Sequence, residues 1–362
     1  MKSWVLLSVL VLAANMLQQY CVDGQQAQVP CLFAFGGTLS DHGNNNNLRT
    51  RAKSNYGPYG INFPRGSTGR FTNGKTQVDF IAEFTRLNTF IPPFGNLRGL
   101  DKEILKGVDY ASGSAGILMD TGSHLGSNIY FLRQISDHRN VYTRIGTILG
   151  GIEKGREHLR KCLYYVNIGN NDYIYNYYLP QFYPRYRRYN PEAFAQVLID
   201  RYLYHIQELR RLGARKFVNV GVGRIGCTPY ALAMNNRTNG SCVEEMNAAA
   251  SIYNAKLRSL MDQLNNKKFG DDGSKFIFVN STARNLGVVA SGFTVTNASC
   301  CPTGTGVLCV PNQTPCQNIN QYVFWDKFAF TEPFNKFLAL LAYNGSNPDY
   351  VYPVNINTLA QS

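Results

Sequence analysis

The chain has 362 residues, of which 44% are hydrophobic and 13% aromatic, and its formal net charge is +13. This composition supplies a sizeable core and fits one large α/β domain or two small ones. It excludes a membrane-spanning protein, because after the first 24 residues no apolar stretch approaches the length of a transmembrane helix.

The N-terminus has the features of a secretory signal peptide, which we assign to residues 1–24. Lys2 precedes an apolar run from Trp4 to Ala14, and small residues follow near Gly24. We expect a secreted protein, located outside the cell or in another compartment of the secretory pathway. The mature chain, residues 25–362, shows no internal repeat or linker and is predicted to form a single domain.

The stretch from Cys31 to Asn47, CLFAFGGTLSDHGNNNN, is the most informative part of the sequence. Its first five residues predict a buried parallel strand, which Gly36 and Gly37 end. Residues 38–41 are predicted to begin a helix, because hydroxyl and carboxylate side chains cap free backbone N–H groups. Thr38 would then lie at a helix mouth, where a nucleophilic hydroxyl is exposed and the helix dipole favours negative charge.

Strands and helices alternate along the rest of the chain. Residues 107–117 predict a short strand and a Gly-rich loop, and residues 163–168 predict a buried strand that delivers Gly169-Asn-Asn-Asp172. Further strands are expected at 216–220 and, as the last of the sheet, at 276–280. Amphipathic helices are expected at 78–87, 131–149, 191–213 and 246–264. This alternation predicts one parallel, doubly wound sheet in a three-layer α/β/α sandwich.

Residues 173–189 contain seven tyrosines with interleaved arginines, and we expect a packed surface loop there. A mobile cover over a cleft, or an aromatic and cationic contact surface, is the alternative.

Eight cysteines remain in the mature chain, and an oxidising compartment favours disulfides among them. For Cys300, Cys301, Cys309 and Cys316 we favour a disulfide-stapled surface loop over a zinc site, and we expect no metal or cofactor. Six N-glycosylation sequons predict surface loops, at Asn236, Asn239, Asn280, Asn297, Asn312 and Asn344.

The motifs at 35–45, 107–117, 169–172 and 322–332 resemble, in this order, the signature blocks of the plant GDSL esterase/lipase family (SGNH hydrolases). The first block normally reads Phe-Gly-Asp-Ser-Leu-x-Asp-x-Gly-Asn-Asn, and the matching residues are Phe35, Gly36, Leu39, Asp41, Gly43, Asn44 and Asn45. The resemblance covers residues 30–343. It implies the flavodoxin-like SGNH hydrolase fold and hydrolysis of carboxylic esters of lipids or acylated small molecules.

The resemblance also assigns roles to residues. Thr38 occupies the position of the nucleophile, and Asn171 that of the amide donor of the oxyanion hole. Gly116 is our choice for the backbone donor of that hole, with Gly113 as the alternative. Asp326 occupies the position of the triad carboxylate.

Three positions depart from the family pattern where its chemistry takes place. Thr38 replaces the nucleophilic Ser, Gly37 replaces Asp, and Ala329 stands where the family has its histidine base. None of the five histidines follows residue 205. Because a hydroxyl nucleophile needs a general base, these changes predict a protein that has kept the scaffold and lost the catalyst.

Two other functions are considered. One is an active ester hydrolase that uses Thr38 with an unusual base, either His42 or one of the carboxylates Asp326 and Glu332. The other is a basic scaffold protein that binds an acidic cell-wall polysaccharide, such as pectin, or another protein. A retained cleft or an active ester hydrolase implies an acyl-ester or lipid ligand. We expect no nucleic-acid partner, because the chain is predicted to be secreted.

Overall fold

The computed structural model describes residues 26–362 except residues 238 and 284–285. The predicted signal peptide, residues 1–24, lies outside the described residues. The described helices are α2 (Gln77–Phe84), α3 (Asp101–Ile104), α4 (Phe131–Ile148), α5 (Ile152–Arg160), α6 (Asn170–Asp172), α7 (Pro191–Arg211), α8 (Pro229–Met234), α9 (Glu244–Asn265), α10 (Glu332–Asn344) and α11 (Ile356–Gln361). The strands are β1 (Leu32–Gly36), β2 (Leu163–Asn167), β3 (Lys216–Val220), β4 (Lys275–Val279), β5 (Val295–Ser299), β6 (Tyr322–Phe324) and β7 (Val351–Tyr352).

The central sheet has the strand order β1-β2-β3-β4-β7, in which the first four strands are parallel and β7 is antiparallel to β4. The backbone of residues 108–112 runs along the other edge of β1. There Ala34 donates to the carbonyl of Val108 (3.0 Å) and accepts from the N–H of Tyr110 (2.8 Å). If this segment is counted as a strand, the parallel order is the 2-1-3-4-5 of flavodoxin-like folds. The predicted α/β sandwich is confirmed.

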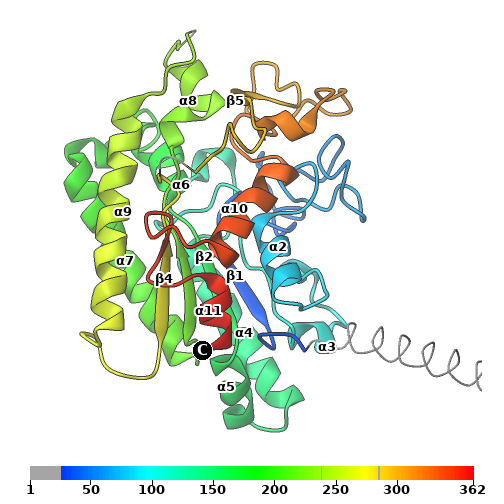
Figure 1. Cartoon of the computed structure of the whole chain (residues 1–362), viewed down its shortest axis with the longest axis vertical. Helices are drawn as coiled ribbons and strands as arrows, with labels where there is room; N and C mark the ends of the chain where they lie inside the picture. The colour runs from blue at the N-terminus through cyan, green and yellow to red at the C-terminus, as the bar shows by residue number, and fades with distance from the viewer. Residues whose placement is uncertain (1–25, 238, 284–285) are drawn as a thin grey trace, which may run out of the picture.

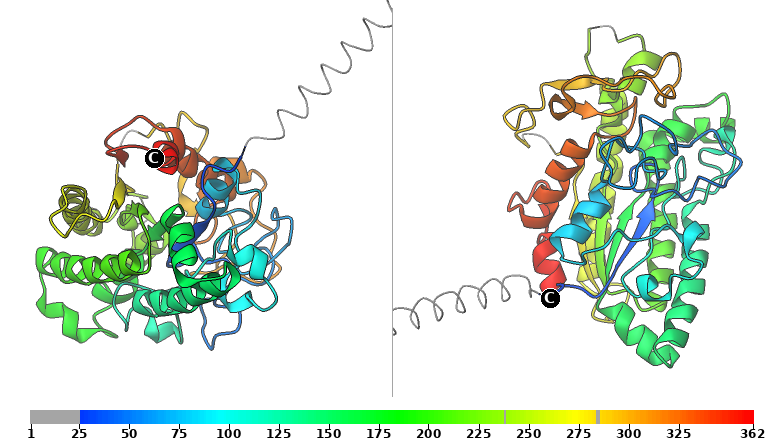
Figure 2. Two further views of the ribbon diagram at one scale, coloured as in Figure 1. Left: turned by 90° about the horizontal axis from the view of Figure 1, so that it is seen from below. Right: turned by 90° about the vertical axis from the view of Figure 1, so that its right-hand side faces the viewer.

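Helices cover both faces of the sheet, because successive side chains of each strand point to opposite faces. Phe33, Phe35 and Tyr164 pack into the larger core, on the side of α4, α7 and α9. Leu32 and Ala34 pack into the second core, on the side of α2, α10 and α11. The strands are buried on both faces, as the continuous apolar runs predicted. The three layers are visible in Figure 1 and in the right-hand view of Figure 2.

Two sequence predictions about these elements are wrong. No helix begins at Thr38; residues 38–40 form a turn, because the Asp41 carboxylate accepts the N–H groups of Gly43 (2.7 Å) and Asn44 (2.8 Å) and so holds the chain in a loop. The strand at 275–279 is not the last one. The short strands β5, β6 and β7 follow it, and β7 extends the main sheet.

The tyrosine-rich segment packs against the larger core, as expected for a packed loop. Tyr173, Tyr175, Tyr183 and Tyr186 are each less than 8% exposed. Within the described residues, no helix combines the length and the apolar character that crossing a membrane requires.

Four disulfides link all eight cysteines of the described residues: Cys31–Cys162, Cys227–Cys242, Cys300–Cys316 and Cys301–Cys309. The first joins the starts of the adjacent strands β1 and β2. The last two cross-link the loop between β5 and β6, which confirms the stapled loop expected from the sequence. The loop itself is largely exposed, while Cys300, Cys301 and Cys309 are buried.

We therefore expect that the protein purified from a secretory host contains no free thiol. Alkylation without reductant should add no label to the unfolded chain, and alkylation after reduction should add eight, because each disulfide releases two thiols. Intact mass spectrometry of the deglycosylated protein measures both numbers. A chain that alkylates fully without reductant would contradict the pairing and the secretory route.

Candidate functional site

Thr38 and Asn171 meet at one end of the sheet. Thr38 lies just beyond the carboxyl end of β1, and Asn171 lies just beyond the carboxyl end of the neighbouring strand β2. In the flavodoxin-like order this is the point where the strand order reverses. Open α/β sheets bind their ligands at such a crevice.

The Thr38 hydroxyl accepts two hydrogen bonds. The backbone N–H of Ser114 donates to its Oγ1 (3.0 Å), and the side-chain amide of Asn171 approaches the same atom (3.4 Å). The same amide nitrogen donates to the carbonyl of Ala115 (2.8 Å), which fixes the side of Asn171 that carries the donor. Thr38 itself is only 8% exposed. Two N–H donors thus converge where an oxyanion hole is expected.

Buried carboxylates hold the loops around this point. Asp41 accepts the N–H of Gly113 (2.8 Å) in addition to its two local bonds, and it thereby ties the loop after β1 to the Gly-rich loop. Burial raises the pKa of Asp41 to about 6, although these N–H groups act in the opposite direction.

Among the described residues, neither of the two glycines considered for the oxyanion hole donates to Thr38. Gly116 packs against Asp172, so closely that a Cβ at this position would lie 2.6 Å from the carboxylate oxygens. Asp172 in turn accepts the N–H groups of Ile117 (2.8 Å) and Leu118 (3.0 Å). Since the N–H of Gly113 is bound to Asp41, the donor that this loop directs at Thr38 is Ser114.

Ser114 was missed by sequence reasoning. It adopts a left-handed backbone conformation (φ 65°), and its N–H donates to Thr38 Oγ1. A serine rarely adopts this conformation, and nothing in the local sequence marks it. The spacing of glycines was the only available signal, and it pointed to Gly113 and Gly116.

Asp326 and Ala329 lie in the loop between β6 and α10. Asp326 is fully buried and accepts the N–H groups of Phe328 (2.7 Å) and Ala329 (2.6 Å) on one oxygen. The Tyr59 hydroxyl donates to the other oxygen (2.6 Å). Burial raises the pKa of Asp326, and these donors oppose the shift. The carboxylate is thus fully hydrogen-bonded without a histidine.

Ala329 is also fully buried, in a cluster with Tyr59, Phe71 and Trp325 against which Leu39 packs. The indole N–H of Trp325 is buried and has no hydrogen-bond partner among the described residues. Phe328 comes from the same loop and lines a small recess together with Gly37, Thr38 and Asn171. The loop that would carry the base therefore does lie over the nucleophile position.

All five histidines lie in the described part of the chain, and none of them bonds with Thr38. His42 contacts the carbonyl of Ile91 (3.2 Å) through Nδ1 and the hydroxyl of Thr76 (2.9 Å) through Nε2. Burial lowers its pKa to about 4. Both ring nitrogens are therefore engaged at the start of α2, in spite of the short sequence distance from Thr38.

Each of the other four histidines also contacts residues other than Thr38. His124 contacts the Tyr183 hydroxyl (2.9 Å), and His138 contacts the Tyr110 hydroxyl (2.9 Å). His158 contacts the carbonyl of Leu105 (2.9 Å), and His205 packs edge-on against Phe131 in the core.

Glu332, the other carboxylate considered as a base, makes its contacts elsewhere. It lies at the start of α10, packs against Gly74 and accepts the N–H of Lys75 (3.1 Å). Among the described residues, neither Glu332 nor Asp326 forms a hydrogen bond with Thr38.

A larger, mostly apolar cavity of about 480 Å³ opens beside the Thr38 recess. The two share the lining residues Leu39, Asn167, Asn170 and Phe328. Besides Leu39 and Phe328, the aromatic and aliphatic part of the lining consists of Ile174, Val220, Ile225, Ala283, Leu286, Val288, Val323, Phe324, Phe330, Phe334 and Leu338. This is the size and the character of a site for a small, largely apolar ligand.

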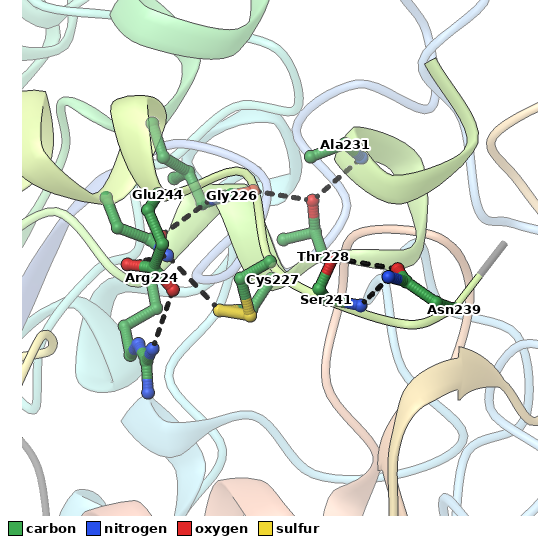
Figure 3. Close-up of a disulfide and its surroundings, with 11 residues drawn as sticks. Arg224, Gly226, Cys227, Thr228, Ala231, Asn239, Ser241 and Glu244 are labelled. Atoms are coloured by element: carbon green, nitrogen blue, oxygen red, sulfur yellow. Dashed lines mark hydrogen bonds and ion pairs between the residues drawn. A yellow bond between two sulfur atoms is a disulfide. The ribbon is translucent and has the colours of Figure 1, made fainter. Parts of the chain in front are cut away.

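The rim of this cavity includes Arg224, Gly240 and the disulfide Cys227–Cys242. Arg224 extends beside the disulfide toward Glu244 (3.6 Å), as Figure 3 shows. The Arg224 side chain is 39% exposed, so it retains donors for a polar group of a ligand. The sequon residue Asn297 also lines this rim, and its side chain packs against Gly240.

Comparison with known proteins places this geometry in a family. Residues 32–342 match the family model described as GDSL-like Lipase/Acylhydrolase. A GDSL esterase/lipase of Arabidopsis thaliana is 44% identical over 343 residues, which are 93% of this chain and 93% of the relative. A second one is 41% identical over 368 residues, covering 100% of this chain and 99% of the relative. A third one is 42% identical over 339 residues and 92% of both chains.

Proposed function

Because the chain belongs to the GDSL-like lipase/acylhydrolase family, we propose that it is a secreted, non-catalytic member that has kept a ligand-binding cleft. The observation that carries this proposal is the environment of Thr38. Its hydroxyl accepts from Ser114 and Asn171, and it meets no imidazole and no carboxylate among the described residues.

The missing base has a large chemical consequence. Loss of a member of a hydroxyl–histidine–carboxylate triad lowers the rate by a factor on the order of 10⁴–10⁶. The oxyanion hole and substrate binding alone retain roughly 10³–10⁴ over the reaction in water. Threonine also adds a β-branch that restricts and crowds the nucleophilic oxygen. The retained donors therefore support binding of a carbonyl group better than its hydrolysis.

An active ester hydrolase is the second candidate, and the names of the relatives favour it. It requires a base within hydrogen-bond reach of Thr38 Oγ1. His42 would have to leave both Ile91 and Thr76, and it would have to leave a buried position. A carboxylate would have to move from its present donors, so this candidate requires a rearranged site.

Secretion is part of the proposal and has three supports. The first 24 residues have the pattern of a signal peptide, and all eight remaining cysteines are paired. Four of the six sequon asparagines, Asn236, Asn239, Asn312 and Asn344, are exposed and do not line the cavity, whereas Asn297 lines its rim and Asn280 is half-buried. N-glycosylation at the four exposed positions fits a surface that a bulky glycan leaves undisturbed.

We assign the ligand of the cleft to the class of acyl esters or other lipids, whose chain would fill the 480 Å³ cavity while a carbonyl oxygen points at Ser114 and Asn171. Each buried methylene contributes about 0.8 kcal/mol, part of which is lost to ordering of the chain. A 12-carbon chain should thus bind with a Kd in the micromolar range.

The test uses a fluorescent dodecyl amide, which resists hydrolysis, and the variant Ala283→Phe, which adds a ring to the lining of the cavity. Ala248→Phe is the matched control, because Ala248 is exposed on α9. We expect Ala283→Phe to weaken binding at least tenfold and the control to leave it unchanged. Equal affinities of the wild type and Ala283→Phe would place the ligand elsewhere and favour the basic scaffold protein.

A further inference from the structure

A second cavity, of about 400 Å³, lies at the opposite end of the sheet from Thr38. One of its lining residues, Arg215, directly precedes the amino end of β3, whereas Thr38 follows the carboxyl end of β1. It lies where the ends of α5 and α7 meet the loop after α9, near the bottom of Figure 1. Its lining consists of Arg156, Arg160, Gln207, Arg210, Arg211, Gly213, Arg215, Phe269 and Asp272.

Asp272 is the only acidic residue among these nine, against five arginines. It pairs with two of them, Arg210 (3.1 Å) and Arg215 (3.5 Å). Arg210 also donates to the carbonyls of Phe269 and Gly270, and Arg215 to those of Arg210 and Asp272. These two side chains are 9% and 13% exposed. They therefore form the buried wall of the cavity.

The guanidinium groups of this wall are close enough to affect one another. Burial lowers the pKa of Arg215, Asp272 opposes the shift, and the neighbouring Arg160 and Arg210 add to it. The positive charge in the cavity is therefore only partly neutralised by the protein itself.

The remaining arginines have donors to spare. Arg160 is exposed, lines the cavity, and has no hydrogen-bond or ion-pair partner among the described residues. The Nε of Arg156 is buried without a partner in the described chain, and its nearest acid, Glu153, is 3.6 Å away and 76% exposed. Arg211 pairs with Glu208 on its own helix. The unpaired N–H groups of the cavity thus belong mainly to Arg156 and Arg160 on α5.

Helix dipoles explain part of this arrangement, because Arg160, Arg210 and Arg211 lie in the last turns of α5 and α7. They do not explain why the charges converge on one hollow, nor why Arg156, one turn earlier, leaves a buried donor unpaired. A bound oxyanion would supply acceptors to the unpaired guanidinium groups of Arg156 and Arg160, because the planar guanidinium matches a carboxylate in a bidentate geometry.

Two further lining residues narrow the chemistry of the ligand. Phe269 is half-buried and contributes an aromatic ring, and Gln207 contributes an amide that both donates and accepts. An aromatic surface, an amide and guanidinium forks together suit the apolar face, the hydroxyl groups and the carboxylate of an acidic sugar. A bare phosphate would use the arginines alone.

We propose that this cavity binds an oligosaccharide of uronic-acid units, with carboxylates at Arg156 and Arg160 and a sugar ring against Phe269. The site is separate from the cleft at Thr38, so it does not depend on whether the protein hydrolyses esters. Such a site would give a function to part of the formal net charge of +13.

The experiment is isothermal titration calorimetry of the glycosylated mature protein with trigalacturonate at low ionic strength. The variant Arg156→Gln/Arg160→Gln removes two charges from the cavity, and its control Arg98→Gln/Arg133→Gln removes two exposed charges elsewhere. We expect saturable binding of trigalacturonate that weakens with salt, a loss of at least tenfold in the cavity variant, and a change below twofold in the control.

Several outcomes would overturn the proposal. The first is an absence of saturable binding, and the second is an equal loss in both double variants, which would show a diffuse charge effect. Binding of neutral maltotriose with the same affinity would remove the role of the carboxylates. Binding of inorganic phosphate as tightly as trigalacturonate, through the same two arginines, would replace the sugar by an isolated oxyanion. Thermal unfolding of each variant verifies that it is folded.

Discussion

The double variant Thr38→Ser/Ala329→His is expected to gain esterase activity, roughly two to three orders of magnitude above either single variant. The single variants should do little, because a nucleophile and its base act as a unit and their effects are strongly non-additive. Turnover of p-nitrophenyl butyrate by all four proteins, from wild type to double variant, measures the gain directly.

The geometry supports this expectation at three points. Ser114 and Asn171 already direct donors at the nucleophile position, and the neighbouring Phe328 brings the 326–329 loop to the same recess. Asp326 is in place three residues before the new imidazole, where it now accepts the N–H of Ala329. The Tyr59 hydroxyl would have to share that carboxylate with the histidine.

The larger side chain must also find room, because Ala329 is fully buried among Tyr59, Phe71 and Trp325. The buried indole N–H of Trp325 has no acceptor among the described residues, so this cluster already contains one unsatisfied polar group. If the folded double variant stays inert on short-chain esters, the cleft has been remodelled beyond the triad. The retained-cleft account would then be replaced by a surface-binding one.

A second round of variants addresses Gly37, which stands where the family has Asp, and Phe330, which stands where the family block usually has Pro. A Cβ at Gly37 would lie 2.8 Å from the Asn171 amide nitrogen and 3.0 Å from the Ala115 carbonyl. Gly37→Asp should therefore displace the Asn171 amide from its present place near Thr38. Phe330 packs against Phe324 and Phe334 in the cavity wall, and Phe330→Pro would open that wall next to the new histidine.

The regular elements were predictable because their signals are local. The apolar runs that became β1 to β4 and the helical periodicity of α4, α7 and α9 were visible in the sequence. Asn190 caps α7 by accepting the N–H of Ala193. The strand β7 was not predicted, because a strand of two residues is too short to show an alternation of apolar and polar side chains. The helix expected at Thr38 failed because the Asp41 side chain binds the local N–H groups that a helix would leave for its own turn.

The site was predictable only in part, for a related reason. The loops that carry Thr38, Asn171 and Asp326 follow strands or precede a helix, so the motifs located them. Ser114, which donates to Thr38 from a left-handed backbone, carries no signal of this geometry in its sequence. The arginine cavity joins residues between 156 and 272, and only the folded chain brings them together. The resemblance to the family supplied roles at matching positions, and this cavity corresponds to none of them.

The second large effect concerns the wild-type protein itself. A carboxylic ester hydrolase activates its hydroxyl through a base, and the described structure gives Thr38 two N–H donors and no base. Turnover of p-nitrophenyl butyrate should therefore fall below that of an active member of the family by a factor on the order of 10⁴ or more. The wild-type protein should also remain unlabelled by a fluorophosphonate probe, which reacts only with an activated hydroxyl.

Fluorophosphonate labelling of the purified wild type, beside Thr38→Ala as the background, is the measurement that tests this account most directly. The account predicts equal signals from the two proteins, at the level of non-specific reaction. A wild-type signal that Thr38→Ala abolishes would contradict it, because the hydroxyl would then have a base that the described contacts of Thr38 do not include.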